Sequence, residues 1–335
     1  MKKWILLTVS MAMMLFVLAA CGSKDEVETD KGDSAEKKPA EESKEDASVY
    51  PLTIPGSTSG ENTFADVTLD KKPEDIIVFD YGFLDTLDAL GVDVAGVAQK
   101  SVPAYLSKYT NTTYMDVGSL KEPDFEALSS MEPDIIFISG AQASAYEELS
   151  KIAPTVFVGV DNENFMESFK ANTELAGKIF GKEKEAAEAF AAYEAKVDEI
   201  KVKTATSEEK ALIVLGNEGS LSAYGAGSRF GVIHDVFGVK AADEGIEVST
   251  NGANVSFEYV RDTNPDILFV VDRDAAVNPE SESGTKAAIE NELVCAINAA
   301  KNNKIFYLDP QYWYLSGGGI TSETAKVDDV LKAFN

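Results

Sequence analysis

The sequence predicts an α/β fold with two Rossmann-like lobes, each with a mostly parallel sheet, joined by one long rigid helix. Patterns of short buried strands alternate with helical patterns along the chain, which is typical of parallel α/β layers. A Pro-Asp pair opens a strand twice, at Pro133-Asp134 and at Pro265-Asp266, which indicates a duplicated unit. Between the two copies, residues 164–203 carry apolar side chains at helical spacing and no proline.

Each element follows from its local pattern. Strands are expected at 75–80, 133–138 and 155–158 in the first copy and at 265–270 and 304–308 in the second, with a helix at 83–91. Gly181 is the expected break in the long helical segment, so the part after it is expected to lie on the second lobe. A stiff helix between two lobes leaves little hinge freedom, and a ligand is expected between them.

The N-terminal residues read as an export signal. Lys2 and Lys3 precede an apolar run that ends in Leu-Ala-Ala-Cys, and this ending resembles a bacterial lipobox with Cys21 as the acylated (palmitate-type) residue. The alternative, a retained membrane-spanning anchor, is disfavoured by the short run. The predicted divisions are a signal peptide at 1–20, an anchor and disordered acidic tether at 21–50, an N-terminal lobe at 51–163, the connecting helix at 164–181 and a C-terminal lobe at 182–335.

Composition excludes several functions. The formal net charge of −27 argues against nucleic acid as a partner. The single histidine, His234, lies in a helical pattern without a Gly-x-Ser-x-Gly nucleophile motif, so we expect a structural histidine, no enzyme and no cofactor. Cys21 belongs to the anchor, and Cys295 is expected to be a buried, small apolar side chain.

Arginine is the informative basic residue. Of the 30 Lys and Arg residues only Arg229, Arg261 and Arg273 are arginines. Arg229 follows a glycine-rich turn after a strand and Arg273 closes a strand, and such loop positions hold ligands in α/β folds. The planar guanidinium suits oxyanions and aromatic faces, although structural salt bridges remain the alternative in so acidic a chain. Arg261 looks like a helix-face residue beside an acid.

Two further features stand out. An aromatic run, Tyr312-Trp313-Tyr314-Leu315, follows the last strand, and a ring facing the cleft could stack on an aromatic ligand, so Tyr312 and Trp313 are candidates. Glu126 and Glu258 lie seven residues before the two Pro-Asp pairs and therefore occupy equivalent places on the two lobes. The alternative is that both are ordinary first-turn glutamates that favour the helix dipole.

Four segments together resemble the siderophore-binding lipoproteins of iron ABC transporters for ferric catecholate and petrobactin-type siderophores. They are the segments at 78–87, 116–125, 228–238 and 313–319, and the similarity extends over the mature body. The resemblance implies a ferric siderophore between the lobes, with Arg229 and Arg273 facing the anionic complex. It also implies that Glu126 and Glu258 dock onto the permease.

This sequence departs from the family pattern at two places. Ala141 stands where the resemblance implies an arginine, beside the candidate Gln142, and Lys100 in a first-lobe loop is the candidate to replace that charge. Asn251 stands where some relatives have an iron-binding histidine, and Tyr312 matches its companion tyrosine. We therefore expect ligand contacts from Asn251 and Tyr312 without direct coordination of iron.

The prediction is a monomeric receptor, anchored by lipid on the outer face of the cell membrane, which captures a ferric siderophore and delivers it to the permease of an ABC importer. Haem or cobalamin binding on the same architecture is the alternative, because the paired arginines and Tyr312 do not exclude those ligands. A lipoprotein hydrolase and an adhesion module are the rivals from other classes.

Overall fold

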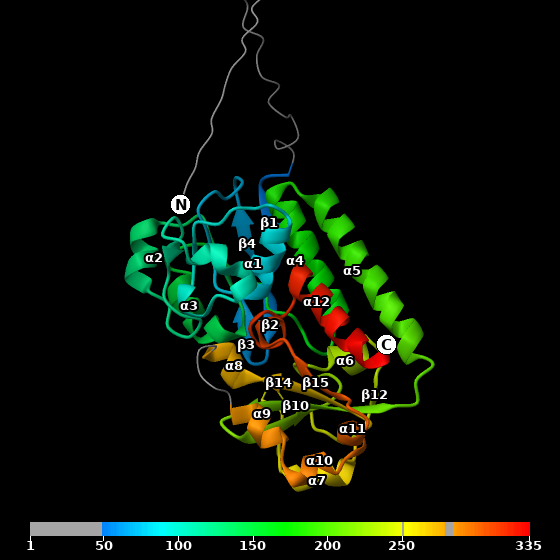
Figure 1. Ribbon diagram of the computed structural model, residues 1–335. Coiled ribbons are helices and arrows are strands. Elements are labelled where there is room, and N and C mark those ends of the chain that lie inside the picture. Colours follow the sequence, from blue (N-terminus) through cyan, green and yellow to red (C-terminus); the bar gives the residue numbers. More distant parts are fainter. Residues whose placement is uncertain (1–48, 250, 279–283) are drawn as a thin grey trace, which may run out of the picture. The chain divides into compact units, whose positions relative to one another are not determined.

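The computed structural model describes residues 49–249, 251–278 and 284–335. These residues belong to one compact unit that contains two large sheets (Figure 1). The strands are β1 Leu52–Ile54, β2 Ser57–Ser59, β3 Asn62–Phe64, β4 Val67–Leu69, β5 Ile76–Val78, β6 Gly96–Val97, β7 Met115–Asp116, β8 Ile135–Ile138, β9 Thr155–Phe157, β10 Lys210–Asn217, β11 Ser220–Tyr224, β12 Lys240–Ala241, β13 Ala253–Val255, β14 Ile267–Asp272 and β15 Ile305–Leu308.

Helices pack against the sheets and connect the strands. The α-helices are α1 Tyr81–Ala89, α2 Phe125–Met131, α3 Tyr146–Leu149, α4 Phe165–Phe180, α5 Glu183–Thr204, α6 Val232–Asp235, α7 Phe257–Thr263, α8 Arg273–Val277, α9 Gly284–Ile289, α10 Glu292–Cys295, α11 Asn298–Lys301 and α12 Ile320–Leu331. Shorter 3₁₀ helices are η1 Gln99–Ser101, η2 Ala104–Thr110, η3 Gly140–Ala145 and η5 Lys332–Phe334, and η4 Gln311–Leu315 is a π-helical turn.

The first sheet has the strand order β7-β6-β5-β8-β9, with every pair parallel. Its central strands β5 and β8 are buried and apolar on both faces, as expected for a parallel sheet that is covered on both sides. Ile76 and Val78 of β5 point into one core cluster, whereas Ile77 points into another on the opposite face. We call the part of the body built on this sheet the first lobe.

The second sheet has the order β13-β11-β10-β14-β15, and β12 also pairs with β10. The β10, β12, β14 and β15 pairings are parallel, while β11 and β13 add an antiparallel edge. Side chains of β14 again alternate between two clusters, with Phe269 on one face and Leu268 and Val270 on the other. The part of the body built on this sheet is the second lobe.

The duplicated Pro-Asp pairs have the same structural role in both lobes. Asp134 accepts a hydrogen bond from the backbone of Glu74, and Asp266 accepts one from the backbone of Lys210, so each ties its strand to the start of the neighbouring strand. The helices before them, α2 and α7, both end at a residue in the left-handed conformation. The internal repeat seen in the sequence is thus present in the local geometry.

Helices α4 and α5 connect the lobes and pack side by side (Figure 1). Gly181, with φ of +65°, ends α4 in the left-handed conformation that favours glycine, at the predicted break. Phe169 of α4 packs in the core of the second lobe, whereas Ile179 and Phe180 pack in the core of the first. One rigid helix therefore contributes to both cores.

Three features differ from the expectations or lie outside them. The sequence patterns did not indicate the antiparallel pairs β1–β4 and β2–β3 before the first sheet. Cys295 is exposed, and the prediction of a buried thiol is wrong: in the short helix α10 it is Val294 that fills the core. In the part of the chain that the structure describes, no helix combines the length and hydropathy needed to cross a bilayer. Cys21, the signal peptide and most of the predicted tether lie outside the described residues.

Candidate functional site

Arg229 stands on a rigid turn after β11. Gly227 has φ of +69°, its backbone N–H donates to the Asp235 carboxylate over 2.6 Å, and a Cβ on Gly231 would approach the Gly227 nitrogen to 2.8 Å. The chain therefore folds back on itself tightly here and needs glycine at both positions. Arg229 itself remains exposed on this turn.

Arg273 begins α8, directly after the buried strand β14. Asp272 caps this helix by accepting from the Ala275 N–H over 3.1 Å. The Arg273 side chain reaches across the end of the second sheet, where its Nη1 donates to Asn217 Oδ1 at the end of β10 over 2.7 Å. Arg273 thus lies at the carboxyl ends of adjacent parallel strands, the usual ligand position in α/β sheets.

Tyr314 brings the two arginines together. The guanidinium carbon of Arg229 lies 4.4 Å from the centre of the Tyr314 ring, and that of Arg273 lies 5.9 Å from it. Arg229 also donates to the Tyr314 carbonyl oxygen, and Arg273 Nε donates to the Tyr314 hydroxyl over 3.0 Å. Two positive charges are therefore fixed around one aromatic ring.

Neither arginine forms a salt bridge with any residue that the structure describes. Arg261, by contrast, pairs with its neighbour Asp262 at 2.7 Å on α7, as its sequence context predicted. In a chain with a net charge of −27, two arginines without a carboxylate partner form an uncompensated positive site. Such a site suits an anionic ligand, and the guanidinium planes also suit aromatic rings.

The other candidates from the aromatic run point elsewhere. The Tyr312 ring packs against Tyr105 of the first lobe with the ring centres 4.8 Å apart and the planes tilted by 48°, and burial and nearby carboxylates raise the pKa of its phenol. Trp313 is only 2% exposed and donates from its indole to Asp329, so its ring belongs to the core of the second lobe.

The remaining predicted ligand residues differ in exposure. Gln142 is buried, its oxygen accepts from the Ser139 N–H and its nitrogen donates to the Leu120 carbonyl, so its amide is already engaged within the first lobe. Lys100 is exposed on η1, and Asn251 is exposed in a turn just before β13. The structure does not bring either of these side chains into contact with the arginines.

The two glutamates occupy equivalent exposed positions. Asp124 caps α2 by accepting from the backbone of Glu126 and of the next residue, and Ser256 caps α7 by accepting from the Tyr259 N–H. Glu126 and Glu258 are thereby each fixed in the first turn of a short helix, one on each lobe. Both carboxylates face solvent, and their use as docking residues stays a prediction.

The His234 ring contacts the backbone of its own segment. Its Nδ1 lies 2.8 Å from the Val239 carbonyl oxygen, and burial lowers the pKa of the imidazole. This geometry agrees with the expected structural histidine.

Sequence reasoning missed a buried contact between the lobes. Asp85 of α1 is fully buried and accepts from the backbone N–H groups of Thr321 and Ser322, at 3.0 and 2.7 Å, at the start of α12. The Tyr105 hydroxyl donates to the same carboxylate over 3.2 Å. Burial raises the pKa of Asp85, while the hydrogen bonds from Thr321 and Ser322 oppose this rise. In the sequence, Asp85 reads only as a polar residue of an amphipathic helix.

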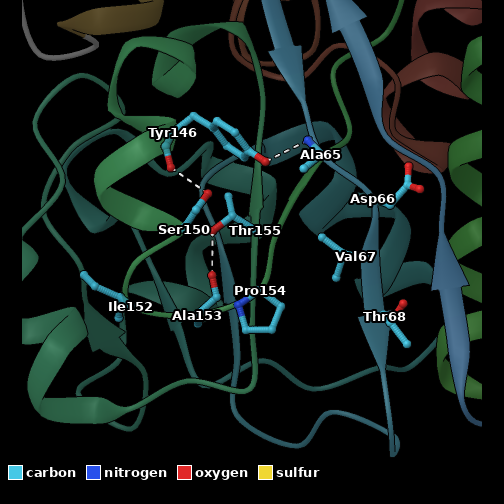
Figure 2. A pocket seen from close by; sticks show the side chains of 10 residues that line it. All are labelled: Ala65, Asp66, Val67, Thr68, Tyr146, Ser150, Ile152, Ala153, Pro154 and Thr155. Carbon is cyan, nitrogen blue, oxygen red and sulfur yellow. Dashed lines mark hydrogen bonds between the residues drawn. The ribbon is translucent and has the colours of Figure 1, made fainter.

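A surface depression on the first lobe does not have the features of a ligand site. It has a volume of about 450 Å³ and is lined by residues of the β4, α3 and β9 segments (Figure 2). Figure 2 shows that three of its hydroxyl groups already bond to backbone: Tyr146 accepts from Ala65, Ser150 donates to Tyr146, and Thr155 donates to Ala153. The predicted ligand residues do not line it.

Comparison with known proteins shows several related binding proteins. The petrobactin-binding protein YclQ of Bacillus subtilis (strain 168) is 42% identical over 332 residues, which cover 98% of each chain. The ferric-anguibactin-binding protein FatB of Vibrio anguillarum is 35% identical over 279 residues, covering 82% of this chain and 86% of FatB.

Solved structures agree with the fold. The crystal structure of YclQ superposes with a TM-score of 0.78 at 45% identity and covers 81% of this chain and 95% of that one. The siderophore-binding protein BauB, solved with two molecules of acinetobactin and ferric iron, has a TM-score of 0.77 at 31% identity, covering 85% and 99% of the two chains. These likenesses confirm the predicted two-lobed α/β fold. Residues 76–312 match the family model described as periplasmic binding protein, and since this match spans more than half of the sequence, the chain belongs to that family.

Proposed function

We propose that this protein captures an anionic ferric siderophore of the catecholate or petrobactin type and delivers it to the permease of an ABC importer. The observation that carries the proposal is the pair Arg229 and Arg273, held around one aromatic ring without carboxylate partners among the described residues. The names of YclQ and FatB, which bind petrobactin and ferric anguibactin, support the same class of ligand.

The role proposed for the arginines is charge complementarity. A hexadentate catecholate fills the coordination shell of iron itself and carries its negative charge over aromatic rings. The protein then needs cations and flat surfaces rather than iron ligands, and guanidinium groups supply both. Tyr312, Lys100 and Asn251 are proposed as further contacts, whereas the buried Gln142 and Trp313 support the walls of the site.

The test is ligand binding by arginine variants. We expect Arg229→Ala and Arg273→Ala each to weaken binding of a ferric tris-catecholate at least about tenfold, which corresponds to about 1.4 kcal/mol. Arg261→Ala is the matched control, because it removes an arginine that is paired with Asp262, and it is expected to bind within about twofold of the wild type. Quenching of Trp313 fluorescence gives the dissociation constants. Unchanged affinity in both site variants would overturn the proposal.

The same titration separates the alternatives. Haem and cobalamin are titrated in parallel, and tighter binding of either would assign the site to that ligand. The absence of binding to every member of the panel would favour an adhesion or interaction module.

Lipid anchoring at Cys21 and docking by Glu126 and Glu258 complete the proposal. A lipid anchor would hold the body at the outer face of the membrane, next to its permease. In cells, Cys21→Ala is expected to release the protein from the membrane fraction, while the affinity for the siderophore remains unchanged because the arginine site lies on the second lobe. A membrane-bound Cys21→Ala variant would contradict the anchor.

A further inference from the structure

Tyr314 contacts both arginines through three different parts of the residue. Its ring face lies under the Arg229 guanidinium, its backbone carbonyl accepts from Arg229, and its hydroxyl accepts from Arg273. Two other residues each contact one of the arginines: Asn217 accepts from Arg273, and the Phe230 ring lies 5.6 Å from the guanidinium carbon of Arg229. Tyr314 is therefore the residue that joins the two cations.

The backbone around Tyr314 explains how it reaches this position. Residues Gln311–Leu315 form a π-helical turn, which is rare and is often found at functional sites. This turn sends three successive rings in three directions: Tyr312 to Tyr105 of the first lobe, Trp313 to the core and Tyr314 to the arginines. The Trp313 indole donates to Asp329, and its ring packs in the core of the second lobe, so this side chain holds the turn in place.

Two adjacent guanidinium groups need such support. Like charges repel, and each long arginine side chain has rotamer entropy that is lost on binding if the side chain is free beforehand. A residue that holds both groups in place before the ligand arrives removes this cost. A guanidinium has five N–H groups, so the bonds to Tyr314 and Asn217 leave donors for the ligand.

We infer that Tyr314 is the positioning residue of the anion site and that it sets the selectivity for highly charged ferric complexes. It acts through Arg229 and Arg273, and the inference rests on the proposed function. Removal of the ring separates the two cations, so a complex that needs both loses more affinity than a neutral complex that needs neither.

The test compares substitutions of Tyr314 with two probes, a trianionic ferric tris-catecholate and a neutral ferric tris-hydroxamate. We expect Tyr314→Leu to weaken binding of the catecholate about tenfold or more and binding of the hydroxamate less than about threefold. Tyr314→Phe keeps the ring and the carbonyl but loses the hydroxyl bond to Arg273, and we expect an intermediate loss of about threefold. Tyr307→Leu, which removes a 40% exposed tyrosine from β15, is the control and leaves both affinities unchanged.

A double-mutant cycle distinguishes positioning from a general structural role. If Tyr314 acts through the arginines, Tyr314→Leu has no further effect on catecholate binding in an Arg229→Ala/Arg273→Ala background. An equal loss in both backgrounds, or equal losses for the two probes, would overturn the inference. If Tyr314→Leu does not fold, the cycle between Tyr314→Phe and Arg273→Ala decides instead, and additive effects there would overturn it.

The outcomes also separate this inference from the proposed function. Loss of binding in the arginine variants with wild-type binding by Tyr314→Leu refutes the role of Tyr314 alone. Wild-type binding by both arginine variants refutes the proposed function itself.

Discussion

Asp85 offers a stability test of the contact between the lobes. Helix α12 begins after Gly319, which has no side chain to cap it, and the Asp85 carboxylate from α1 takes that place. A Cβ on Gly319 would lie 2.3 Å from Asp85 Oδ2, so the glycine leaves the space that the carboxylate fills. Asp85→Ala therefore removes the cap of a helix that belongs to the other lobe.

The magnitude follows from the bonds that are lost. Loss of an N-cap costs about 0.5–2 kcal/mol. A buried N–H left without a partner costs about 1–3 kcal/mol, and the Ser322 N–H is in this position, whereas the Thr321 N–H is only partly buried. Part of this loss is offset because the buried carboxylate is itself desolvated, which raises its pKa. We expect a net loss of about 2–3 kcal/mol in the free energy of unfolding, or a fall in Tm of about 3–5 °C for a body of this size.

Thermal and urea unfolding of the purified protein measure this loss. The control is Asp328→Ala, which removes an acid on the same helix whose ion pair with Lys196 is exposed by 51% and 35% at its two side chains and is expected to contribute below about 1 kcal/mol. Asp85→Asn keeps one acceptor oxygen and is expected to lose about half as much as Asp85→Ala. If Asp85→Ala lowers Tm no more than Asp328→Ala does, the capping argument is wrong.

Three further predictions concern transport, pH and ligand charge. Glu126→Ala and Glu258→Ala are expected to bind siderophore normally but to reduce uptake by cells several-fold; a matching loss of affinity would place them in the ligand site instead. Burial lowers the pKa of His234 in the folded protein, so the unfolded chain binds a proton at this histidine first as pH falls, and stability is expected to fall as pH drops from about 6.5 through the lowered pKa. The His234→Asn variant is expected to lose less stability than the wild type when Tm is measured between pH 7.5 and 5. Identical pH profiles of Tm for the two proteins would refute this. Ala141→Arg is expected to tighten binding of a trianionic catecholate about threefold or more without affecting a neutral hydroxamate, and the ratio of the two dissociation constants tests it. Unchanged binding of both would contradict this prediction and would favour Lys100 as the residue that already supplies the charge.

The fold could be predicted because its signals are local. Buried strands, the helix break at Gly181 and the repeated Pro-Asp pairs all depend on patterns within a few residues. The antiparallel pairs β1–β4 and β2–β3 escaped because their strands have three residues each, too few to show a period. The exposure of Cys295 escaped for a related reason, since a four-residue helix gives no periodicity from which to assign its faces.

The two arginines of the site could be predicted from composition, whereas the directions of the aromatic side chains depend on backbone geometry and could not be predicted. A chain that uses lysine almost throughout places Arg229 and Arg273 at strand ends, and the structure brings both to one ring. The sequence marked the aromatic run as a unit, but the π-helical turn separates its rings, and an ordinary helical period would have assigned their directions wrongly. A signal that was present and went unused is the glycine segment after the run, because Gly319 allows α12 to begin close against the Asp85 carboxylate.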